Sequence, residues 1–397
     1  MMNRRHALTL ALCGLATSQG CRKSEKRPVA EIETKEMEPP PELDAIEGGN
    51  LTPVRVDPDL EIRTVTGLRP YRPSGFMVRR EERGGKSIIH NYGHGGAGIT
   101  LSWGSAHLAT QLAGPLSGKS CAVIGGGVIG LSTARLLQLH GAQVTLYTRD
   151  LPPQTTSNIA GAQWWPVSVF APELRTEVFS QQFIEAANFS NRYFQNLVGP
   201  RWAVRWLPNY YLSNGEPANG WLSGPGGVLH HLQIDLQDFG PGEHIFPSSH
   251  VRRFHTMLIE PATYLTTLLG EARGAGAKIE IREFLGEADV LSLPENLIFN
   301  CSGLGAGGLF GDEELMPIKG QLSVLIPQPA VDYNLISDLF YMFPRTDGVI
   351  LGGTFDRGRA DLQVDPADRK RILDGHQRLF DQMAKNQQAV RDRARGI

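Results

Sequence analysis

The sequence predicts an α/β fold in which a Rossmann-like dinucleotide-binding domain is joined to a second domain. A short strand, a glycine-rich turn, a helix and another strand follow one another between residues 120 and 148. A further glycine-rich turn, in "IIHNYGHGGAGITLSWG" (88–104), comes earlier in the chain. The length of 397 residues is enough for a large core and about two domains.

Composition excludes several classes of protein. Hydrophobic residues make up 41% and charged residues 20%, as in an ordinary globular protein, and the net charge of −2 indicates no nucleic-acid partner. Four cysteines are too few for a disulfide scaffold. Cys121 and Cys301 lie in apolar strand patterns and are expected to be buried thiols. No HExxH or paired CxxC spacing occurs, so no metal site is expected.

The first residues have the pattern of an export signal. Residues 1–21 carry a basic start, an apolar run and then small residues, which predicts a signal peptide too short to span a membrane. The pair Arg4–Arg5 suggests twin-arginine (Tat) export. Cys21 resembles the attachment site of a bacterial lipoprotein. We expect an exported protein, periplasmic or anchored on the outer side of a membrane through Cys21, with a cytoplasmic location as the alternative.

Residues 22–57 are charged and proline-rich, with little apolar content. Such a segment cannot bury enough apolar surface to offset the entropy of ordering. It is therefore predicted to be a disordered tether, which would suit a protein held away from a membrane surface.

The unit from residue 120 to residue 148 has the GxGxxG spacing of a dinucleotide site. Gly125 makes the tight turn, Gly127 lets a pyrophosphate reach the helix N-terminus, and Gly130 lets helix and strand pack closely. Because the motif lies between a strand and a helix, it predicts dinucleotide binding.

The residues after the second strand leave the dinucleotide open. Thr148 stands where an acidic residue is expected; Asp150 could reach the ribose, whereas Arg149 could favour the 2′-phosphate of NADP. However, hydroxyl and small residues follow in "TTSNIAGAQWWP" (155–166), and further glycine turns follow strands in "LIFNCSGLGAGG" (297–308) and in the segment 88–104. Several glycine-lined turns suit FAD, which is long and buried along its length. No His or Cys lies at an evident attachment position, so the FAD is expected to be non-covalent.

At this point the chain resembles the D-amino-acid oxidase family of FAD enzymes. The resemblance rests on "VIGGGVIGLSTARLL", "TTSNIAGAQWWP", "RRFHTMLIEPATYL", "IFNCSGLGA", and "TGLRPYRP" with "IIHNYGHGGAGITLSWG". The segments "YMFP" (341–344) and "VILGGTF" (349–355) extend it. It implies a Rossmann-like FAD-binding domain (α/β) and a substrate domain built on a mixed β-sheet (α+β).

The order of these blocks differs from the family's order. In the family the Rossmann turn opens the chain and the GxRP and HNYGHGG blocks close it, whereas here residues 66–103 precede Gly125. The segment "HQRLFDQMAKNQQAVRDRARGI" resembles the one that leads into GxRP. We therefore predict a circular permutation, joined through "LAGPLSGK" (112–119), with the new termini close together. The predicted segments are 58–114 (FAD-binding, C-terminal in the family), 115–170 (Rossmann FAD-binding core), 171–260 (substrate domain), 261–312 (FAD-binding domain) and 313–397 (substrate domain and helical tail).

The resemblance implies three residues for substrate binding. Arg69 matches the arginine that binds the substrate carboxylate, Tyr341 the tyrosine that hydrogen-bonds it, and the Gly96 carbonyl the group that holds the amine. A bidentate guanidinium suits a carboxylate. Without the motif, Arg69 would read as a surface ion-pair partner and Tyr341 as a half-buried strand residue.

The residues expected around the substrate side chain match the family's pattern less well. Gln163 and Trp165 are expected to shape it, and Ser337 stands where mammalian members carry a second tyrosine. A different local alignment would bring Phe340 or Tyr333 near the pocket. These departures leave the identity of the substrate open, but they do not change the expected type of reaction.

The cofactor site is expected to collect residues from five separate segments. They are Gly125, Gly126, Gly127, Val128, Ile129, Gly130, Thr155, Thr156, Ser157, Gly161, Ala162, Phe284, Ser302, Gly303, Gly95, Gly96, Ala97, Gly98, Ile99 and Thr100. His90 and His94 flank the first glycine turn, and His94 is expected to hold that loop by hydrogen bonds rather than act as an acid–base group.

The implied activity is oxidation of D-amino acids. Hydride passes from the substrate Cα to the flavin, the imino acid hydrolyses to a 2-oxo acid and ammonia, and O2 becomes hydrogen peroxide. The alternatives are a glycine- or sarcosine-type amine oxidase, a D-aspartate oxidase, a flavin dehydrogenase that passes electrons to a membrane acceptor, and a flavin-binding protein without turnover. The expected partners are a D-amino acid and O2, and a homodimer is left open.

Overall fold

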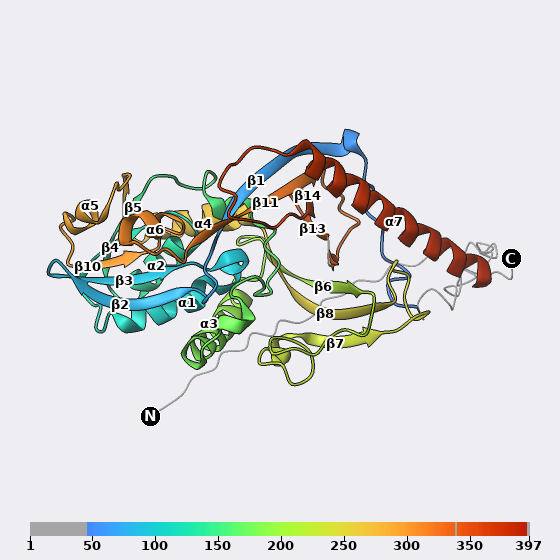
Figure 1. The fold of residues 1–397 in the computed structure, drawn as a ribbon, viewed down its shortest axis with the longest axis horizontal. Helices are drawn as coiled ribbons and strands as arrows, with labels where there is room; N and C mark the ends of the chain where they lie inside the picture. Colours follow the sequence, from blue (N-terminus) through green and yellow to red (C-terminus); the bar gives the residue numbers. More distant parts are fainter. Residues whose placement is uncertain (1–45, 338–339, 395–397) are drawn as a thin grey trace, which may run out of the picture. The chain divides into compact units, whose positions relative to one another are not determined.

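The computed structural model describes residues 46–337 and 340–394. Two β-sheets and the helices packed on them make up this part of the chain (Figure 1). The predicted signal peptide (1–21), the Arg4–Arg5 pair, Cys21 and most of the predicted tether lie outside the described residues, so export and lipid attachment stay predictions. Within the described residues, no helix has both the length and the apolar character needed to cross a bilayer.

The first sheet has six strands and contains the predicted Rossmann unit. Its order is β2 (Met77–Arg83), β3 (Lys86–Tyr92), β10 (Leu297–Asn300), β4 (Ser120–Ile124), β5 (Gln143–Thr148), β9 (Lys278–Ile281). The strands from β3 to β9 run parallel, and β2 pairs antiparallel with β3. The predicted strand–turn–helix–strand is confirmed as β4, α2 (Val128–Leu139) and β5.

Helices cover both faces of this sheet, which explains the continuous apolar runs of its strands. On one face, Cys121 and Val123 of β4 pack in a core with α1 (Gly98–Leu112), α2 and α4 (Pro261–Gly274). On the other face, Ala122 and Ile124 pack with residues in and next to α5 (Glu287–Leu291) and α6 (Gly305–Phe310). Both described thiols are buried, as predicted, and burial raises the pKa of Cys121 to about 11.

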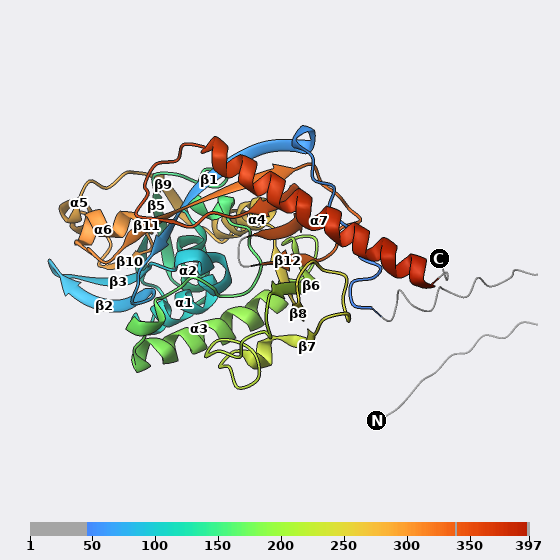
Figure 2. The ribbon, with the colours of Figure 1, turned by 45° about the vertical axis from the view of Figure 1, so that its right-hand side comes forward.

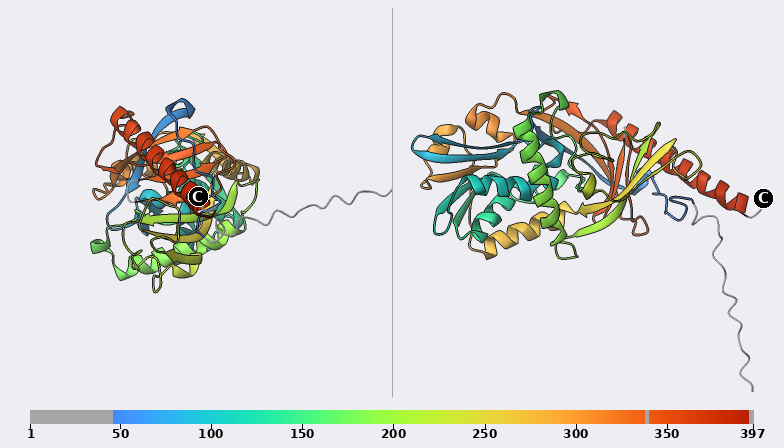
Figure 3. Two further views of the ribbon diagram at one scale, coloured as in Figure 1. Left: turned by 90° about the vertical axis from the view of Figure 1, so that its right-hand side faces the viewer. Right: turned by 90° about the horizontal axis from the view of Figure 1, so that it is seen from below.

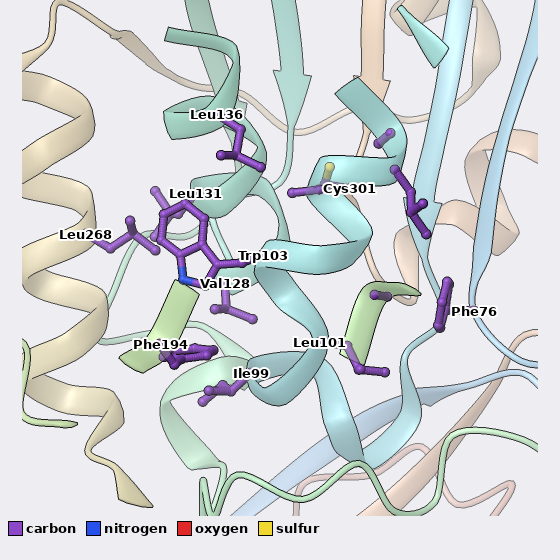
Figure 4. Packing of buried hydrophobic residues seen from close by; sticks show 14 of the residues in the cluster. Phe76, Ile99, Leu101, Trp103, Val128, Leu131, Leu136, Phe194, Leu268 and Cys301 are labelled. Atoms are coloured by element: carbon purple, nitrogen blue, oxygen red, sulfur yellow. The ribbon is translucent and has the colours of Figure 1, made fainter. Parts of the chain in front are cut away.

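Helix α1 is the centre of the larger core because it lies between α2 and α3 (Glu177–Gln195). Trp103 of α1 donates from Nε1 to the Tyr264 hydroxyl at 2.8 Å and stacks on Tyr193 with centroids 3.8 Å apart. Figure 4 shows Trp103 surrounded by apolar side chains of other helices. A Cβ on Gly104 would lie 1.9 Å from the carbonyl oxygen of Ala186, so the approach of α1 to α3 requires glycine.

The second sheet has nine strands and is mixed, as predicted. Its order is β1 (Glu61–Tyr71), β11 (Met316–Leu325), β14 (Gly348–Gly352), β13 (Tyr341–Arg345), β12 (Asn334–Ile336), β6 (Val204–Ser213), β8 (His250–Ile259), β7 (Ile234–Phe239), with β15 (Asp356–Arg357) on β11. Only β12 and β6 pair in parallel among these described strands. The predicted segment 58–114 thus contributes β1 to this sheet and β2, β3 and α1 to the other unit.

The long helix α7 (Pro366–Ala394) packs on the nine-stranded sheet (Figure 2). Its apolar residues, among them Ile372 and Phe380, share a core with Leu335, Met342 and Leu351 of the sheet. Short 3-10 helices lie at Pro58–Leu60, Gly95–Ala97 (η2), Thr156–Ile159 (η3), Pro172–Leu174 (η4) and His230–Leu232.

The end of the predicted tether is part of the folded unit. Val54 and Val56 are buried, and Gln387 of α7 donates from Nε2 to the carbonyl oxygens of Gly49 at 3.1 Å and Leu51 at 2.6 Å. The prediction of a disordered tether is therefore wrong for residues 46–57, whose apolar side chains have a core to enter. This segment lies beside α7 (Figure 3).

We expect Gly104→Ala to destabilise the protein by about 2 to 3 kcal/mol, because the added methyl group overpacks the contact between α1 and α3. Urea unfolding followed by circular dichroism measures the change. Gly270→Ala in α4 is the matched control: no atom lies within 4 Å of its added Cβ, and alanine should stabilise this helix slightly. Equal stabilities of the two variants would contradict the packing argument.

Candidate functional site

The parallel strands of the six-stranded sheet end at a common edge, and the strand order reverses there between β10 and β4. Open α/β sheets bind ligands in the crevice at such a switch point. The turns that follow the two strands meet: a Cβ on Gly125 would lie 2.4 Å from the carbonyl oxygen of Cys301. The predicted cofactor segments 125–130 and 302–303 are thus brought together.

The glycine turn after β4 has the geometry that a dinucleotide needs. Gly125 has φ +114°, and a Cβ on Gly130 would lie 1.9 Å from the Gly125 carbonyl oxygen. Gly127 precedes α2, and the first amide of that helix, Val128 N–H, donates to Ser157 Oγ at 3.0 Å. A hydroxyl oxygen at this helix N-terminus marks a position that also suits a phosphate oxygen. These residues fit the pyrophosphate of FAD.

Other predicted cofactor residues border the same edge. Gly95–Ala97 form η2, and α1 begins at Gly98, whose added Cβ would lie 3.9 Å from Val128 Cγ1. Ser302 Oγ donates to Asn300 Oδ1 at 2.6 Å, and Gly303 has φ +58°. Two helix N-termini therefore lie side by side with the turn after β10.

Not every predicted cofactor residue directs its side chain to this edge. The side chains of Val128 and Ile99 pack in the core. Thr155 directly precedes η3, which begins at Thr156, and its Oγ1 donates to Asn158 Oδ1. Phe284 packs edge-on to Tyr147 with centroids 6.0 Å apart. Of the remaining members, Gly126 lies near Thr148, Ile129 is in α2 and Thr100 is in α1. Gly161 and Ala162 lie beside the nine-stranded sheet.

The residues after β5 do not offer a free cation for a 2′-phosphate. Arg149 donates from Nε to Asp150 Oδ2 at 2.8 Å and lies 3.6 Å from Glu283. Thr148 donates to the Asp150 carbonyl oxygen at 2.7 Å. With Arg149 paired to two carboxylates, this end of the site favours FAD over NADP.

The three predicted substrate-binding residues come together. Arg69 on β1 donates from Nη1 to the Thr354 carbonyl oxygen at 3.2 Å, and its Nη2 lies 3.5 Å from the Tyr341 hydroxyl on β13. A Cβ on Gly96 would lie 3.8 Å from Arg69 Cδ. Because Gly96 belongs to η2, the Arg69 side chain lies against the glycine turn at this edge of the six-stranded sheet.

Three glycines that we did not predict make room for these side chains. A Cβ on Gly320 of β11 would lie 2.6 Å from Arg69 Nη1, and on Gly352 or Gly353 it would lie 2.2 or 2.4 Å from the Tyr341 ring. Gly352 and Gly353 belong to "VILGGTF", but Gly320 in "IKGQL" carries no local signal. Their role appears only in the strand register.

The predicted pocket residues Gln163 and Trp165 are buried in the core. Gln163 donates from Nε2 to Asn209 at 2.7 Å, and Trp165 packs on Phe254 with centroids 5.2 Å apart. The exposed residues just beyond them lie over the glycine turn instead, since the Ser168 carbonyl oxygen accepts from Gly96 N–H at 3.1 Å. Ser168 has φ +57°, which is uncommon for a residue other than glycine.

The residues around Ser337 do not agree with the alternative alignments that bring Phe340 or Tyr333 near the substrate pocket. Ser337 N–H donates to the Phe340 carbonyl oxygen at 2.7 Å, around residues 338–339, which lie outside the described part. The Phe340 ring packs on His376 of α7, with centroids 4.9 Å apart. Tyr333 is fully buried, and its hydroxyl donates to the Thr52 carbonyl oxygen at 3.0 Å. Placing Phe340 or Tyr333 at the pocket is therefore wrong.

The two histidines of the glycine turn have different surroundings. His94 stacks on Phe76 with centroids 4.9 Å apart, and its Nε2 has no hydrogen-bond partner among the described residues. Burial lowers the pKa of His94 to about 3, so packing of a neutral ring replaces the expected hydrogen bonds. His90 bonds to Glu81 at 2.9 Å and to Asn300 at 3.0 Å, which ties it to the last residue of β10.

The described residues contain no group of three or more potential metal ligands. Burial raises the pKa of the Cys301 thiol beside this turn to about 12, which makes it unreactive. The polar chemistry of the site therefore comes from backbone amides, the Tyr341 hydroxyl and the Arg69 guanidinium.

Comparison with known proteins agrees with this geometry. The family model described as FAD dependent oxidoreductase matches residues 47–112 and 120–396. A D-amino-acid oxidase of Rubrobacter xylanophilus is 31% identical over 266 residues, which cover 63% of this chain and 74% of that protein. The human D-aspartate oxidase is 27% identical over 64% of this chain and 73% of its own length. The solved glycine oxidase of Geobacillus kaustophilus, 15% identical, matches in fold over 67% of this chain and 79% of its own, with a TM-score of 0.51.

Protonation of His94 should make stability depend on pH. Its folded pKa of about 3 lies below the unfolded value of about 6.5, so the unfolded state takes up the proton first and stability falls as the pH drops below 6.5. By pH 5 the loss should reach about 2 kcal/mol. We expect His94→Phe to remove this part of the difference between urea unfolding at pH 8 and at pH 5. The exposed His140, changed to Phe, is the control and should keep the wild-type difference; a His94 variant with that same difference would refute the assignment.

Proposed function

Because the chain belongs to the family of FAD-dependent oxidoreductases, we propose that it is an oxidase of D-amino acids. The products are a 2-oxo acid, ammonia and hydrogen peroxide. The observation that carries the proposal is the cluster of Arg69, Tyr341 and Gly96 beside the dinucleotide crevice. When bound, FAD supplies the acceptor for the hydride that leaves the substrate Cα.

Arg69 is shaped to receive a carboxylate. Its described partners are neutral: the Thr354 carbonyl oxygen, the Tyr341 hydroxyl and the Phe355 ring, 5.6 Å away. With Gly320 behind it, the guanidinium is held in one orientation before substrate arrives. A bidentate, charge-assisted pair with the α-carboxylate, joined by the Tyr341 hydroxyl, would orient the substrate.

The amine end of the substrate would lie at the glycine turn. The Ser168 carbonyl oxygen holds the Gly96 N–H, so the peptides of this turn have a set orientation, and the Gly96 carbonyl is the proposed acceptor for the amine. Burial lowers the pKa of His94 to about 3, so its ring is a weak base. The role of these residues is to position the neutral amine and exclude water rather than to move a proton.

Oxygen uptake with a panel of D- and L-amino acids, glycine and sarcosine tests the proposal. We expect uptake with D-amino acids and one hydrogen peroxide for each 2-oxo acid. Flavin reduction without oxygen uptake would indicate a dehydrogenase, and no reduction by any D-amino acid would refute the proposal.

We also propose that the chain order is a circular permutation of the family's. The family match falls into two segments on either side of the short turn 113–119. In that turn Gly118 N–H donates to the Gly141 carbonyl oxygen at 2.9 Å, as in an ordinary connecting loop. At the other end, residues 49–51 contact Gln387 of α7.

Removing the carboxylate anchor should weaken substrate binding and spare the flavin. We expect Arg69→Leu to raise KM for D-amino acids at least about 30-fold, since a charge-assisted pair is worth about 2 kcal/mol or more. Gly320→Ala should raise KM by a smaller factor, because its methyl group displaces the guanidinium. Gly308→Ala, with no atom within 4 Å of the added Cβ, should leave KM unchanged. Steady-state kinetics and bound-flavin content are measured together; an unchanged KM in Arg69→Leu would remove Arg69 from the site.

Restoring the family order should preserve the enzyme. A chain that runs from residue 115 to Ile397 and continues through a short Gly/Ser linker into residues 46–114 keeps every described contact outside the opened turn. The segments to be joined are in contact at Leu51 and Gln387, and closure entropy grows slowly with loop length, so several linker lengths are compared. We expect flavin content and kcat/KM close to those of the original chain. Insoluble or flavin-free protein with several linker lengths would contradict the permutation.

A further inference from the structure

A second arginine lies beside the carboxylate anchor. Phe355, between β14 and β15, has the Arg69 guanidinium carbon 5.6 Å and the Arg357 guanidinium carbon 5.7 Å from its ring centroid. Arg357 also lies over the Tyr71 ring at 5.7 Å. Since a Cβ on Gly95 would lie 3.1 Å from Tyr71 Cδ2, this cation is on the side of the glycine turn.

Arg357 is exposed, and no residue in the described part of the chain forms an ion pair with it. Arg357, Glu173 and Glu314 all act on the Tyr71 hydroxyl, and burial, the largest effect, raises the pKa of Tyr71. Glu314 is held by Arg72 Nη2 at 2.6 Å. Glu173, exposed in η4, is therefore the nearby carboxylate with which an incoming anion would compete.

The segment that carries Arg357 is held in place on both sides. Arg357 is in register with Ile318 in the β15–β11 pair, and Gly358 N–H donates to the Pro317 carbonyl oxygen at 2.9 Å. Further along, the buried Lys319 donates to Asp361 at 2.6 Å. The backbone that carries Arg357 thus has a defined place relative to β11.

We propose that Arg357 binds the side-chain carboxylate of an acidic D-amino acid whose α-carboxylate is bound by Arg69. The inference rests on the proposed function and narrows its substrate to D-glutamate and D-aspartate. Because Arg69 and Arg357 both lie over the Phe355 ring, their guanidinium carbons are at most about 11 Å apart. The carboxyl carbons of these substrates are about 4 to 5 Å apart when extended, and each paired guanidinium carbon lies about 4 Å further out, so the molecule spans the gap.

The sharpest test compares each acid with its isosteric amide. We expect the ratio of kcat/KM for D-glutamate to that for D-glutamine to be about ten or more in the wild type, and likewise the ratio for D-aspartate to D-asparagine. Arg357→Gln should reduce both ratios to about one, and Arg357→Lys should restore part of the preference. Glu173→Gln should raise both ratios by removing the competing carboxylate. Arg192→Gln, an exposed arginine on α3, is the control and should keep the wild-type ratios.

A binding measurement separates this inference from the proposed function. Succinate and butyrate are titrated against the flavin-loaded protein and followed by the visible flavin spectrum. We expect succinate to bind about tenfold more tightly than butyrate, and Arg357→Gln to abolish the difference. A wild type that oxidises D-amino acids but treats acids and amides alike overturns the role of Arg357 and leaves the proposed function standing. Absence of any D-amino acid oxidation overturns the function, while the succinate preference still decides whether Arg357 and Arg69 form a dicarboxylate site.

Discussion

A backbone bridge between Tyr71 and His94 connects the end of β1 to the turn that follows β3, and the candidate site depends on it. β1 belongs to the nine-stranded sheet and β3 to the six-stranded sheet. The bridge therefore sets the distance between Arg69, two residues before Tyr71, and Gly96, two residues after His94. Arg72 strengthens the junction: it is buried, it bonds to Asp312 at 2.7 Å and to Glu314 at 2.6 Å, and its side chain lies in the space beside Gly93.

Arg69 and Arg72 show how the same residue type serves two purposes within "RPYR". Arg72 has two carboxylate partners, and a buried charge with such partners is a structural element. Arg69 has only neutral described partners, which orient its guanidinium without neutralising it. Arg69 has no anionic partner within the described chain, and the proposed function assigns that place to the substrate carboxylate. The contrast between the two arginines supports the proposal that Arg69 binds a substrate carboxylate, whereas Arg72 has a structural role.

The sequence predicted best what is local. The spacing of Gly125, Gly127 and Gly130 was sufficient for β4, α2 and β5, because a strand, a tight turn and a helix N-terminus depend on neighbouring residues. The association of Arg69 with Tyr341 came from resemblance alone. Gly320 and Gly352 were missed because their role lies across strands, in a register that one sequence does not reveal. The apolar residues near Val54 were misjudged for the same reason, since a run of letters does not show what it packs against.

Chain order adds a last constraint. From β1 to α2 one continuous stretch carries Arg69, which is the proposed carboxylate anchor, the glycine turn of η2, the core helix α1 and the glycine turn before α2. Yet β1 pairs with β11 and β3 pairs with β10, and both partners are distant in sequence. The backbone hydrogen bonds of β1 and β3 therefore form only with strands that come much later in the chain. The site is therefore specified by non-covalent contacts between distant segments rather than by the order of the segments along the chain. Since closing a connection costs free energy that rises only slowly with its length, these contacts can stay unchanged while the chain opens at a different surface turn. That is the physical reason why a permuted order is compatible with the geometry of Arg69, Tyr341 and Gly96.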